Sequence, residues 1–197
     1  YGHLGHYRCE SGDLQRPQPD VRVVGLDLQG LAGSRLELES GGRRTRLEVR
    51  LPGLFNAYNI VAAMATAEAL ELDRSATARA LADTDPVFGR AEVIAAPETE
   101  LILLLVKNPA GANQMLDLLA LEPEPLDTLL LLNDGVADGE DISWIWDVDF
   151  ERLKVRRLTV GGRRAQDMAL RLKYAGVHPA VDRIRVVPGI AAPLDAA

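Results

Sequence analysis

The chain of 197 residues is long enough for one full domain, or for one domain and part of another. Its composition, with 47% hydrophobic and 26% charged residues, is that of a globular protein and argues against disorder. The 22 basic and 29 acidic side chains give a formal charge of −7, a poor match to duplex nucleic acid, and the longest aliphatic run, Leu101–Val106, is far shorter than the ~20 residues of a membrane span.

Residues 1–20 are rich in glycine, histidine and proline and have neither helical nor strand periodicity, so we expect a loop or a small knuckle. The single cysteine, Cys9, excludes an internal disulfide framework and fits a reducing compartment. His3, His6 and Cys9 follow one another at three-residue spacing and could ligate a metal. Because no fourth ligand is apparent, we expect no complete metal site from these residues alone. The absence of a starting methionine at Tyr1 leads us to expect a piece of a longer protein.

A strand-rich region follows. Residues 21–26 predict one strand. Residues 35–39 and 45–51 alternate strictly between apolar and polar side chains around Gly41-Gly42. This pattern predicts a β-hairpin with one buried face.

Two helices are predicted after the hairpin, which ends at Pro52-Gly53. Residues 56–72 are rich in alanine and carry larger apolar side chains at helical spacing. Residues 75–83 form the second predicted helix, with Ser75 as its N-cap.

From about residue 86 the pattern changes to short aliphatic runs that alternate with helical segments. The runs are residues 101–106, 127–132, 157–160 and 183–187. The helical segments are residues 112–120, a short one near 143–153, and 164–175, closed by Gly176. Near-continuous aliphatic strands that alternate with helices predict a parallel sheet covered on both faces, and therefore an α/β domain.

Three polar loops follow the predicted strands, at residues 107–113, 133–141 and 161–164. Ligands of open parallel sheets bind outside the carboxyl ends of the strands, so we place the candidate site along this edge. The chain contains no G-x-x-x-x-G-K-[ST] motif and no G-x-G-x-x-G motif after a strand, so it carries neither a P-loop nor a dinucleotide fingerprint.

Three basic or polar side chains near this edge could face a nucleotide. Arg90, which follows Gly89, could form a bidentate contact with phosphate oxygens, or it could be a surface ion pair in a linker. Lys107 and Asn108 could hold a phosphate and a ribose or base edge, or they could be a solvated charge and a turn. The residues alone leave these interpretations open.

Both tryptophans of the chain, four aspartates and one phenylalanine fall within residues 138–150. Tryptophan is enriched at binding surfaces, and clustered carboxylates could bind a metal, cap a helix or orient a histidine. The alternative is a short helix that Trp144 pins against the sheet, with Asp141 as its N-cap. The two interpretations do not exclude each other.

These motifs together resemble the Mur ligase family. Residues 53–63 look like the helix opening at the end of the Mur ligase central domain, and Gly-Arg-Ala-Glu at 89–92 looks like the start of the C-terminal domain. Lys-Asn-Pro-Ala-Gly-Ala-Asn at 107–113 and the segment 138–147 resemble the MurT-like subunit of lipid II isoglutaminyl synthase, which residues 167–174 also fit. Residues 1–9 look like the second half of the zinc ribbon inserted in that subunit.

The resemblance implies a Rossmann-like C-terminal Mur ligase domain over residues 86–197, truncated at its end. It implies the C-terminal part of the central domain over residues 21–85 and a remnant of the zinc-ribbon-like insert over residues 1–20. The complete subunit would bind ATP and Mg²⁺ and phosphorylate the α-carboxyl of D-glutamate in lipid II. A GatD-like class I glutaminase, the partner in a heterodimer, would supply ammonia for amidation in cytoplasmic peptidoglycan synthesis, with lipid II met at the inner membrane face.

The resemblance also assigns roles to particular residues. Arg90, Lys107 and Asn108 match positions that face ATP, and Asp141 matches the acid thought to orient the histidine of the partner's Cys-His pair. Cys9 matches a zinc ligand, but Ser11 stands where the family has a further cysteine. The P-loop and most Mg²⁺ ligands would lie outside this chain, so we expect no ATP hydrolysis from it alone.

Two alternatives remain open at this point. The chain could be the C-terminal part of another Mur-type or folylpolyglutamate-type ligase that joins an amino acid instead of ammonia. Those ligases commonly carry a histidine in the loop where this chain has Asn-Pro-Ala-Gly at residues 108–111. It could also be a non-catalytic module that only docks a glutaminase.

Overall fold

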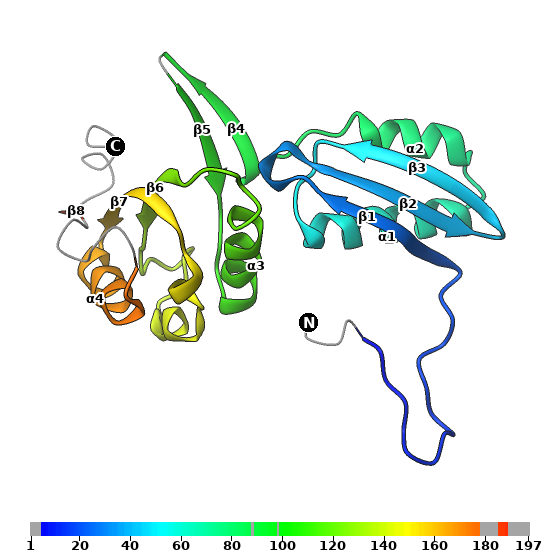
Figure 1. The fold of residues 1–197 in the computed structure, drawn as a ribbon, viewed down its shortest axis with the longest axis horizontal. Helices are drawn as coiled ribbons and strands as arrows, with labels where there is room; N and C mark the ends of the chain where they lie inside the picture. Colours follow the sequence, from blue (N-terminus) through cyan, green and yellow to red (C-terminus); the bar gives the residue numbers. More distant parts are fainter. Residues whose placement is uncertain (1–4, 88, 98, 178–184, 189–197) are drawn as a thin grey trace.

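The computed structural model describes residues 5–87, 89–97, 99–177 and 185–188, and its elements form two groups (Figure 1). The first group is an antiparallel sheet with two helices, and the second contains a parallel sheet, a separate hairpin and two helices. Each group encloses a hydrophobic core of its own.

The antiparallel sheet consists of β1 (Val21–Leu28), β2 (Ser34–Ser40) and β3 (Arg43–Val49), in that order. The predicted hairpin is confirmed in β2 and β3: Ser40 lies opposite Arg43, and the connecting Gly41 and Gly42 have φ angles of +54° and +74°. Positive φ at both central positions is the geometry of a type I′ turn, which glycine adopts without strain. The turn therefore explains why two glycines stand between the strands.

One face of this sheet is buried against α1 (Leu54–Ala69). Leu36 and Leu38 of β2 share a core with Ile60 and Met64 of α1, and all four side chains are at most 3% exposed. Alternation along a strand and four-residue spacing along a helix each place such side chains on one face, so the two apolar faces meet. The helix covers residues 54–69 instead of the predicted 56–72.

The second helix, α2 (Arg74–Ala82), begins after Asp73, so the prediction of Ser75 as its N-cap is wrong. The Asp73 carboxylate accepts a hydrogen bond from the amide of Ala76 at 2.7 Å. Two residue types that favour N-caps stand close together here, and the one with extended backbone precedes the helix.

The second group begins with a hairpin of β4 (Arg90–Ala96) and β5 (Thr99–Leu104), which projects from the rest of the molecule (Figure 1). Residues 101–106 were expected in the parallel sheet, but the strand pairs antiparallel with β4 in a sheet separate from the parallel one. A short aliphatic run predicts a strand without specifying its partner. Large apolar side chains of this hairpin remain exposed: Val93, Ile94, Leu101 and Leu103.

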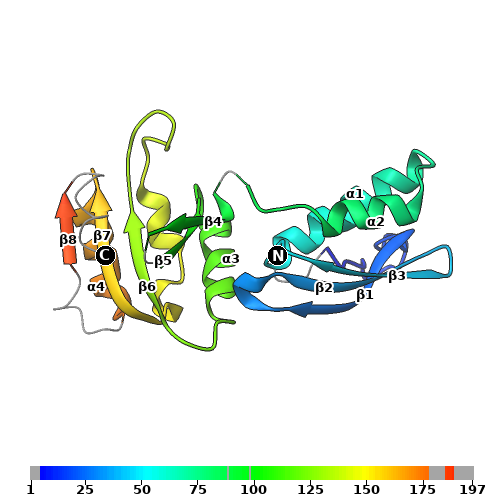
Figure 2. The same ribbon diagram turned by 90° about the horizontal axis from the view of Figure 1, so that it is seen from above.

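The parallel sheet consists of β6 (Leu126–Leu131), β7 (Val155–Gly162) and β8 (Arg185–Pro188), which run in the same direction in Figure 2. The predicted strand at residues 183–187 begins outside the described residues, and its remaining part lies in β8. The accompanying helices are α3 (Pro109–Leu119) and α4 (Ala165–Ala175). Leu116 of α3, Val160 of β7 and Leu172 of α4 belong to one core, which confirms the predicted α/β fold.

Three short 3₁₀ turns complete the described elements: η1 (Gly30–Ala32), η2 (Ser143–Asp147) and η3 (Phe150–Arg152). The first connects the two groups, because the Leu31 amide donates to Oε1 of Glu122, beyond the end of α3, at 2.6 Å. Gly30 has a φ of +58°, and a Cβ at this position would collide with the Glu122 carboxylate. In place of the predicted short helix near residues 143–153, the structure has two 3₁₀ turns, η2 and η3.

Candidate functional site

The loops that follow β6 and β7 are joined at the carboxyl edge of the parallel sheet. The amide of Arg164 donates to the Leu132 carbonyl at 3.0 Å, and the amide of Arg163 donates to Oδ1 of Asn133 at 3.0 Å. Gly162, with a φ of +91°, lies so close to the first loop that a Cβ would collide with the Leu132 carbonyl oxygen. The close approach therefore requires glycine, and the two loops form one unit.

Ion pairs reinforce this junction. Asp134 lies 3.4 Å from Arg163 and 3.2 Å from Arg164, and Nε of Arg164 donates to Asp167 at 2.8 Å. Hydrogen bonds to Asp167 and Asp134 raise the pKa of Arg164, and the Arg164 guanidinium lowers the pKa of Asp167. Local sequence patterns mark both loops as polar but assign no role to Asp134, because its two arginine partners stand about 30 residues away along the chain.

Lys107 brings the loop after β5 to the same edge. Its Nζ donates to the carbonyl of Ala137, in the loop after β6, at 3.2 Å. The next residue, Asn108, is the N-cap of α3: its Oδ1 accepts a hydrogen bond from the Gly111 amide at 2.8 Å, and Pro109 occupies the first helical turn. Asn108 therefore orients the helix, while its exposed position leaves it next to Lys107 at the edge of the site.

Arg90 lies at the same end of the β4–β5 hairpin as Lys107. It pairs in register with Leu104, and the Leu105 amide donates to the Gly89 carbonyl at 2.7 Å. The Gly89 amide donates to Oε2 of Glu92 at 2.9 Å, so the glutamate of the Gly-Arg-Ala-Glu motif closes the turn before β4. This arrangement leaves the Arg90 side chain exposed. The structure thus places Arg90 at the base of the hairpin, at the end from which the chain continues to Lys107 and Asn108.

Asp141 is exposed and begins the segment that contains both tryptophans. Its Oδ1 accepts a hydrogen bond from the Ser143 amide at 2.8 Å. Hydrogen bonds from the Ser143 amide and hydroxyl lower the pKa of Asp141, so the carboxylate stays ionised at neutral pH. The bond reaches two residues along the chain, as in an Asx turn, and Ile142 stands directly before η2. Asp141 is therefore not the N-cap of η2, as predicted, but forms an Asx turn one residue before the N-cap position.

The turn after Asp141 is anchored mainly by Ile145, which is 1% exposed and lies in the core of the second group. Trp144 is partly buried against the same core, so the expectation that it pins the turn holds in part. Trp146 is 50% exposed and lies 5.9 Å from the ring of Tyr174 on α4. The segment therefore combines a firmly packed side with an aromatic side that faces solvent.

The opening segment places Cys9 in a small knuckle. The Leu14 amide donates to Sγ of Cys9 at 3.1 Å, and the Ser11 hydroxyl lies 3.0 Å from the same sulfur. The bond with Ser11, followed by that from Leu14, lowers the pKa of Cys9 to about 7. Within the described ranges, which exclude His3, no three His, Cys, Asp or Glu side chains form a group that could hold a metal. The residues described here do not fit a complete zinc site.

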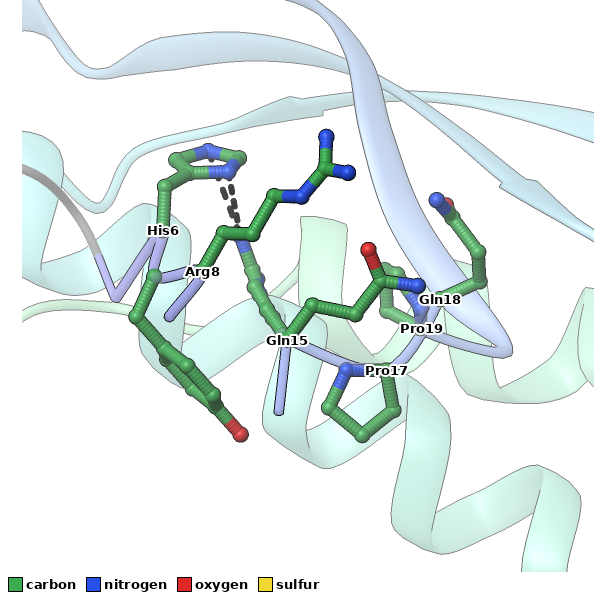
Figure 3. A pocket seen from close by; sticks show the side chains of 8 residues that line it. His6, Arg8, Gln15, Pro17, Gln18 and Pro19 are labelled. Carbon is green, nitrogen blue, oxygen red and sulfur yellow. Dashed lines mark hydrogen bonds between the residues drawn. The ribbon is translucent and has the colours of Figure 1, made fainter. Parts of the chain in front are cut away.

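His6, the other candidate ligand, lines an open hollow of about 410 Å³ with Arg8, Gln15 and neighbouring residues (Figure 3). The Arg16 guanidinium contacts the imidazole ring of His6, with Nη1 of Arg16 3.2 Å from Nε2 of His6. A histidine that faces a guanidinium is poorly placed to receive a cation.

None of the helices in the described ranges combines the length and the hydropathy of a membrane span.

The chain is similar in sequence to known proteins. Residues 105–196 match the family described as MurT ligase C-terminal. The MurT subunit of lipid II isoglutaminyl synthase from Streptococcus pneumoniae is 36% identical over 183 residues, and that from Staphylococcus aureus strain COL is 33% identical over 182. These alignments cover 91% and 90% of the chain, and the chain spans about 40% of the length of either relative.

Solved structures show the same fold. MurF from Acinetobacter baumannii aligns with 97% of the chain at a TM-score of 0.69 and 16% identity, over 39% of its own length. Folylpolyglutamate synthase from Mycobacterium tuberculosis, in complex with ADP and AMPPCP, aligns with 90% of the chain at a TM-score of 0.66 and 22% identity, over 40% of its own length.

The fold, with its loops gathered at one edge of a parallel sheet, is that of the C-terminal part of Mur-type ligases. Residues 105–196 belong to the MurT ligase C-terminal family, and 90% or more of the chain is similar to the MurT subunits of lipid II isoglutaminyl synthase.

Proposed function

We propose that the chain is the C-terminal part of the ATP-dependent amidating subunit of a lipid II isoglutaminyl synthase. The observation that carries the proposal is the meeting of the loops after β5 and β6 at one edge, through the Lys107–Ala137 hydrogen bond, with the loop after β6 leading to exposed Asp141. Similarity to MurT subunits over 90% or more of the chain supports the same conclusion. In this proposal, residues 86–197 are the C-terminal ligase domain, residues 21–85 end the central domain, and residues 1–20 come from an insert.

The proposed reaction activates the α-carboxyl of D-glutamate in lipid II as an acyl phosphate, which ammonia then attacks. A carboxylate is a poor electrophile until one oxygen becomes part of a phosphate leaving group. Arg90 and Lys107 would neutralise phosphate oxygens of ATP, and Asn108 would fix the position of α3 beside them. Mg²⁺ would neutralise the phosphates, and its ligands belong mostly to parts of the protein outside this chain.

Asp141 would act on the partner subunit rather than on lipid II. A glutaminase of the Cys-His class needs a carboxylate to hold its histidine in the correct tautomer and orientation. Asp141 is exposed and ionised, and the Ser143 amide fixes it, so it can reach a partner without rearrangement of the loop. Glutamine hydrolysis would then start only in the complex, in the bacterial cytoplasm where lipid II is made.

Two other functions are less well supported. A Mur-type or folylpolyglutamate-type amino-acid ligase shares the fold, but the solved examples are 16% and 22% identical, against 33% to 36% for the MurT subunits. A module that only docks a glutaminase would not need Arg90 and Lys107 to bind a nucleotide. The two sets of residues can be tested separately.

Asp141→Asn in the full-length subunit tests the proposed role on the glutaminase. Loss of an orienting carboxylate lowers kcat by several orders of magnitude in related triads, so we expect at least a ~100-fold loss of glutamine hydrolysis in the reconstituted complex. ATP binding by the full-length subunit should be retained. Glu140→Gln, which changes the neighbouring exposed carboxylate, is the control and should hydrolyse glutamine normally. Full activity of Asp141→Asn would reject the triad role.

Arg90→Ala tests the nucleotide role. Loss of one charged hydrogen bond to phosphate should weaken ATP binding by about 10-fold, measured by calorimetric titration of the full-length subunit. Arg44→Ala is a suitable control, because Arg44 pairs with Glu37 and Glu39 on the antiparallel sheet, in the other group of elements. An unaltered titration for Arg90→Ala would remove Arg90 from the site.

A further inference from the structure

Arg171 on α4 is a buried arginine, only 5% exposed. Its Nε donates to the Ile145 carbonyl at 3.2 Å, and one terminal nitrogen donates to the Val148 carbonyl at 2.5 Å and to the Glu151 carboxylate at 3.0 Å. The guanidinium also lies 5.6 Å from the ring centre of Phe150. Burial of a cation is costly unless its donors are paired. The paired guanidinium therefore holds α4 against the segment that follows Asp141.

The segment that Arg171 contacts has little regular structure of its own. It consists of η2 and η3, and 3₁₀ turns of this length have weak internal hydrogen bonding. Ile145 and Val148 are each 1% exposed, and each carbonyl accepts one backbone hydrogen bond, from the amide of Val148 at 3.4 Å and from the amide of Phe150 at 2.9 Å, besides the bond from the guanidinium. Trp146, whose ring centre is 5.6 Å from the guanidinium, packs against the same cation. Arg171 therefore adds a side-chain hydrogen bond to each of two buried carbonyls, and so holds the segment against α4.

The two ends of η2 are held by opposite charges. Asp141 accepts the Ser143 amide at the start of the turn, and Arg171 binds the Ile145 carbonyl inside it and the Val148 carbonyl after it. The Ile145 amide donates back to the Ile142 carbonyl at 3.2 Å, which connects the two anchor points through one turn of backbone. The guanidinium and the Ser143 amide that holds the carboxylate are therefore connected through this one turn of backbone.

We propose that Arg171 is the positioning residue of Asp141: by fixing the backbone of residues 142–148 it presents the carboxylate to the partner's histidine. This inference rests on the proposed role of Asp141. Arg171 has no contact with substrate and acts only through the turn. The bidentate guanidinium matters because it spans two carbonyls at once, which a lysine ammonium at the end of a flexible stem does not reproduce.

The test is a double-mutant cycle of Arg171→Lys and Asp141→Asn in the full-length subunit, assembled with the glutaminase. Misplacement of a catalytic group by about 1 Å costs up to about 100-fold, so we expect Arg171→Lys to lower kcat for glutamine hydrolysis by about 10-fold or more, with the KM for glutamine unchanged. In the Asp141→Asn background the same substitution should have no further effect on kcat, because no carboxylate remains to be positioned. Arg152→Gln, which breaks a surface ion pair with Asp117 in the same segment, is the control and should leave kcat unchanged.

The cycle separates the two proposals. Loss of activity in Asp141→Asn with full kcat in Arg171→Lys would overturn the positioning role and leave the proposed function intact. An equal loss from Arg171→Lys in both backgrounds would also overturn it, since the effect would not pass through Asp141. Full activity of Asp141→Asn would reject the proposed function and this inference with it. If Arg171→Lys does not fold, Glu151→Gln replaces it in the same cycle, with a smaller loss of kcat that again vanishes without Asp141.

Discussion

The β2–β3 and β4–β5 hairpins both contain aliphatic side chains but differ in what covers them. Leu36 and Leu38 of β2 are at most 3% exposed, whereas Leu101 and Leu103 of β5 are 40% and 44% exposed. In β2, apolar and charged residues alternate, so one face can pack on α1 while the other carries charges. In β5 aliphatic side chains follow one another without interruption, so both faces are apolar. Strict alternation therefore indicates a strand with one buried and one exposed face, whereas an uninterrupted aliphatic run does not show which face is buried.

Charged residues are also used differently in the two groups. On the antiparallel sheet they pair across neighbouring strands, as Arg46 does with Glu37, and such exposed pairs contribute little to stability. In the second group they tie loops that stand far apart in the sequence, as Asp134 does with Arg164. The same residue types thus form exposed ion pairs on the antiparallel sheet and connect the loops of the candidate site in the second group.

The largest expected effect comes from the contrast between the buried and the exposed leucine. Leu38→Ala should lower the free energy of unfolding by about 2–5 kcal/mol, because Leu38 is fully buried and a cavity would remain beside α1. Leu101→Ala, the matched change on β5, should cost less than about 1 kcal/mol, as for exposed sites. Hydrogen exchange of the β2 and β5 amides in the full-length protein measures both. Equal losses would show that the β4–β5 hairpin is covered in the intact protein.

A pair of glycines with nearly the same backbone conformation tests the close approach at the candidate site. Gly162 and Gly139 have φ angles of +91° and +93°, but a Cβ meets the Leu132 carbonyl oxygen only at Gly162, and open space at Gly139. Gly139→Ala should cost about 1 kcal/mol from backbone strain alone, and Gly162→Ala about 2–3 kcal/mol. Thermal unfolding of the full-length protein measures both. Equal costs would mean that the loops separate easily.

The fold was largely predictable because its signals are local. Alternation around Gly41-Gly42 predicted the hairpin, and Gly176 closes α4 with a φ of +62°, as expected. Partnership between distant segments was not predictable: nothing local in residues 101–106 shows that they pair with β4 instead of the parallel sheet. Sequence periodicity identifies which face of an element is apolar, but not which other element covers that face.

The helix caps illustrate a narrower limit and give the next prediction. Asp73 and Ser75 both favour N-caps, and only the structure shows that Asp73 binds the Ala76 amide. Asp73→Ala should therefore lower the free energy of unfolding by about 1 kcal/mol, while Ser75→Ala, inside the first turn, should change it by less than about 0.5 kcal/mol. The two variants can be compared by thermal unfolding. The reverse order would show that the helix begins later in solution.

The candidate site was predictable where motifs mark it and obscure where contacts are long-range. Lys107, Asn108 and Asp141 stand in recognisable loops, so their sequence motifs identify them without the tertiary structure. The sequence does not distinguish Arg171 from a solvated charge on an amphipathic helix, because its carbonyl partners lie more than 20 residues away along the chain. Buried cations of this kind are predictable only from the tertiary structure.

The smallest expected effect concerns the ion pairs between β6 and β7. Hydrogen bonds from Arg156, at 2.7 and 2.8 Å, and from Arg157 lower the pKa of Asp127 in the folded protein. Because the unfolded carboxyl has a pKa of about 4, the stabilisation is fully present above that pH and is lost as the pH falls towards the folded pKa. The difference in thermal midpoint between the wild type and Asp127→Asn should thus be greatest near pH 7 and shrink by pH 3.

The salt dependence of the thermal midpoint is a second test of the Asp127 ion pairs. Since Arg156 and Arg157 are exposed, the gap in thermal midpoint at pH 7 should be small and should narrow further in 1 M salt, where screening acts within about 3 Å. A buried pair such as Arg171 with the Ile145 and Val148 carbonyls should be far less sensitive to salt. A gap for Asp127→Asn that stays constant from pH 7 to pH 3 would show that the carboxylate is not paired with either arginine in solution. The β6–β7 edge would then depend on its aliphatic core alone.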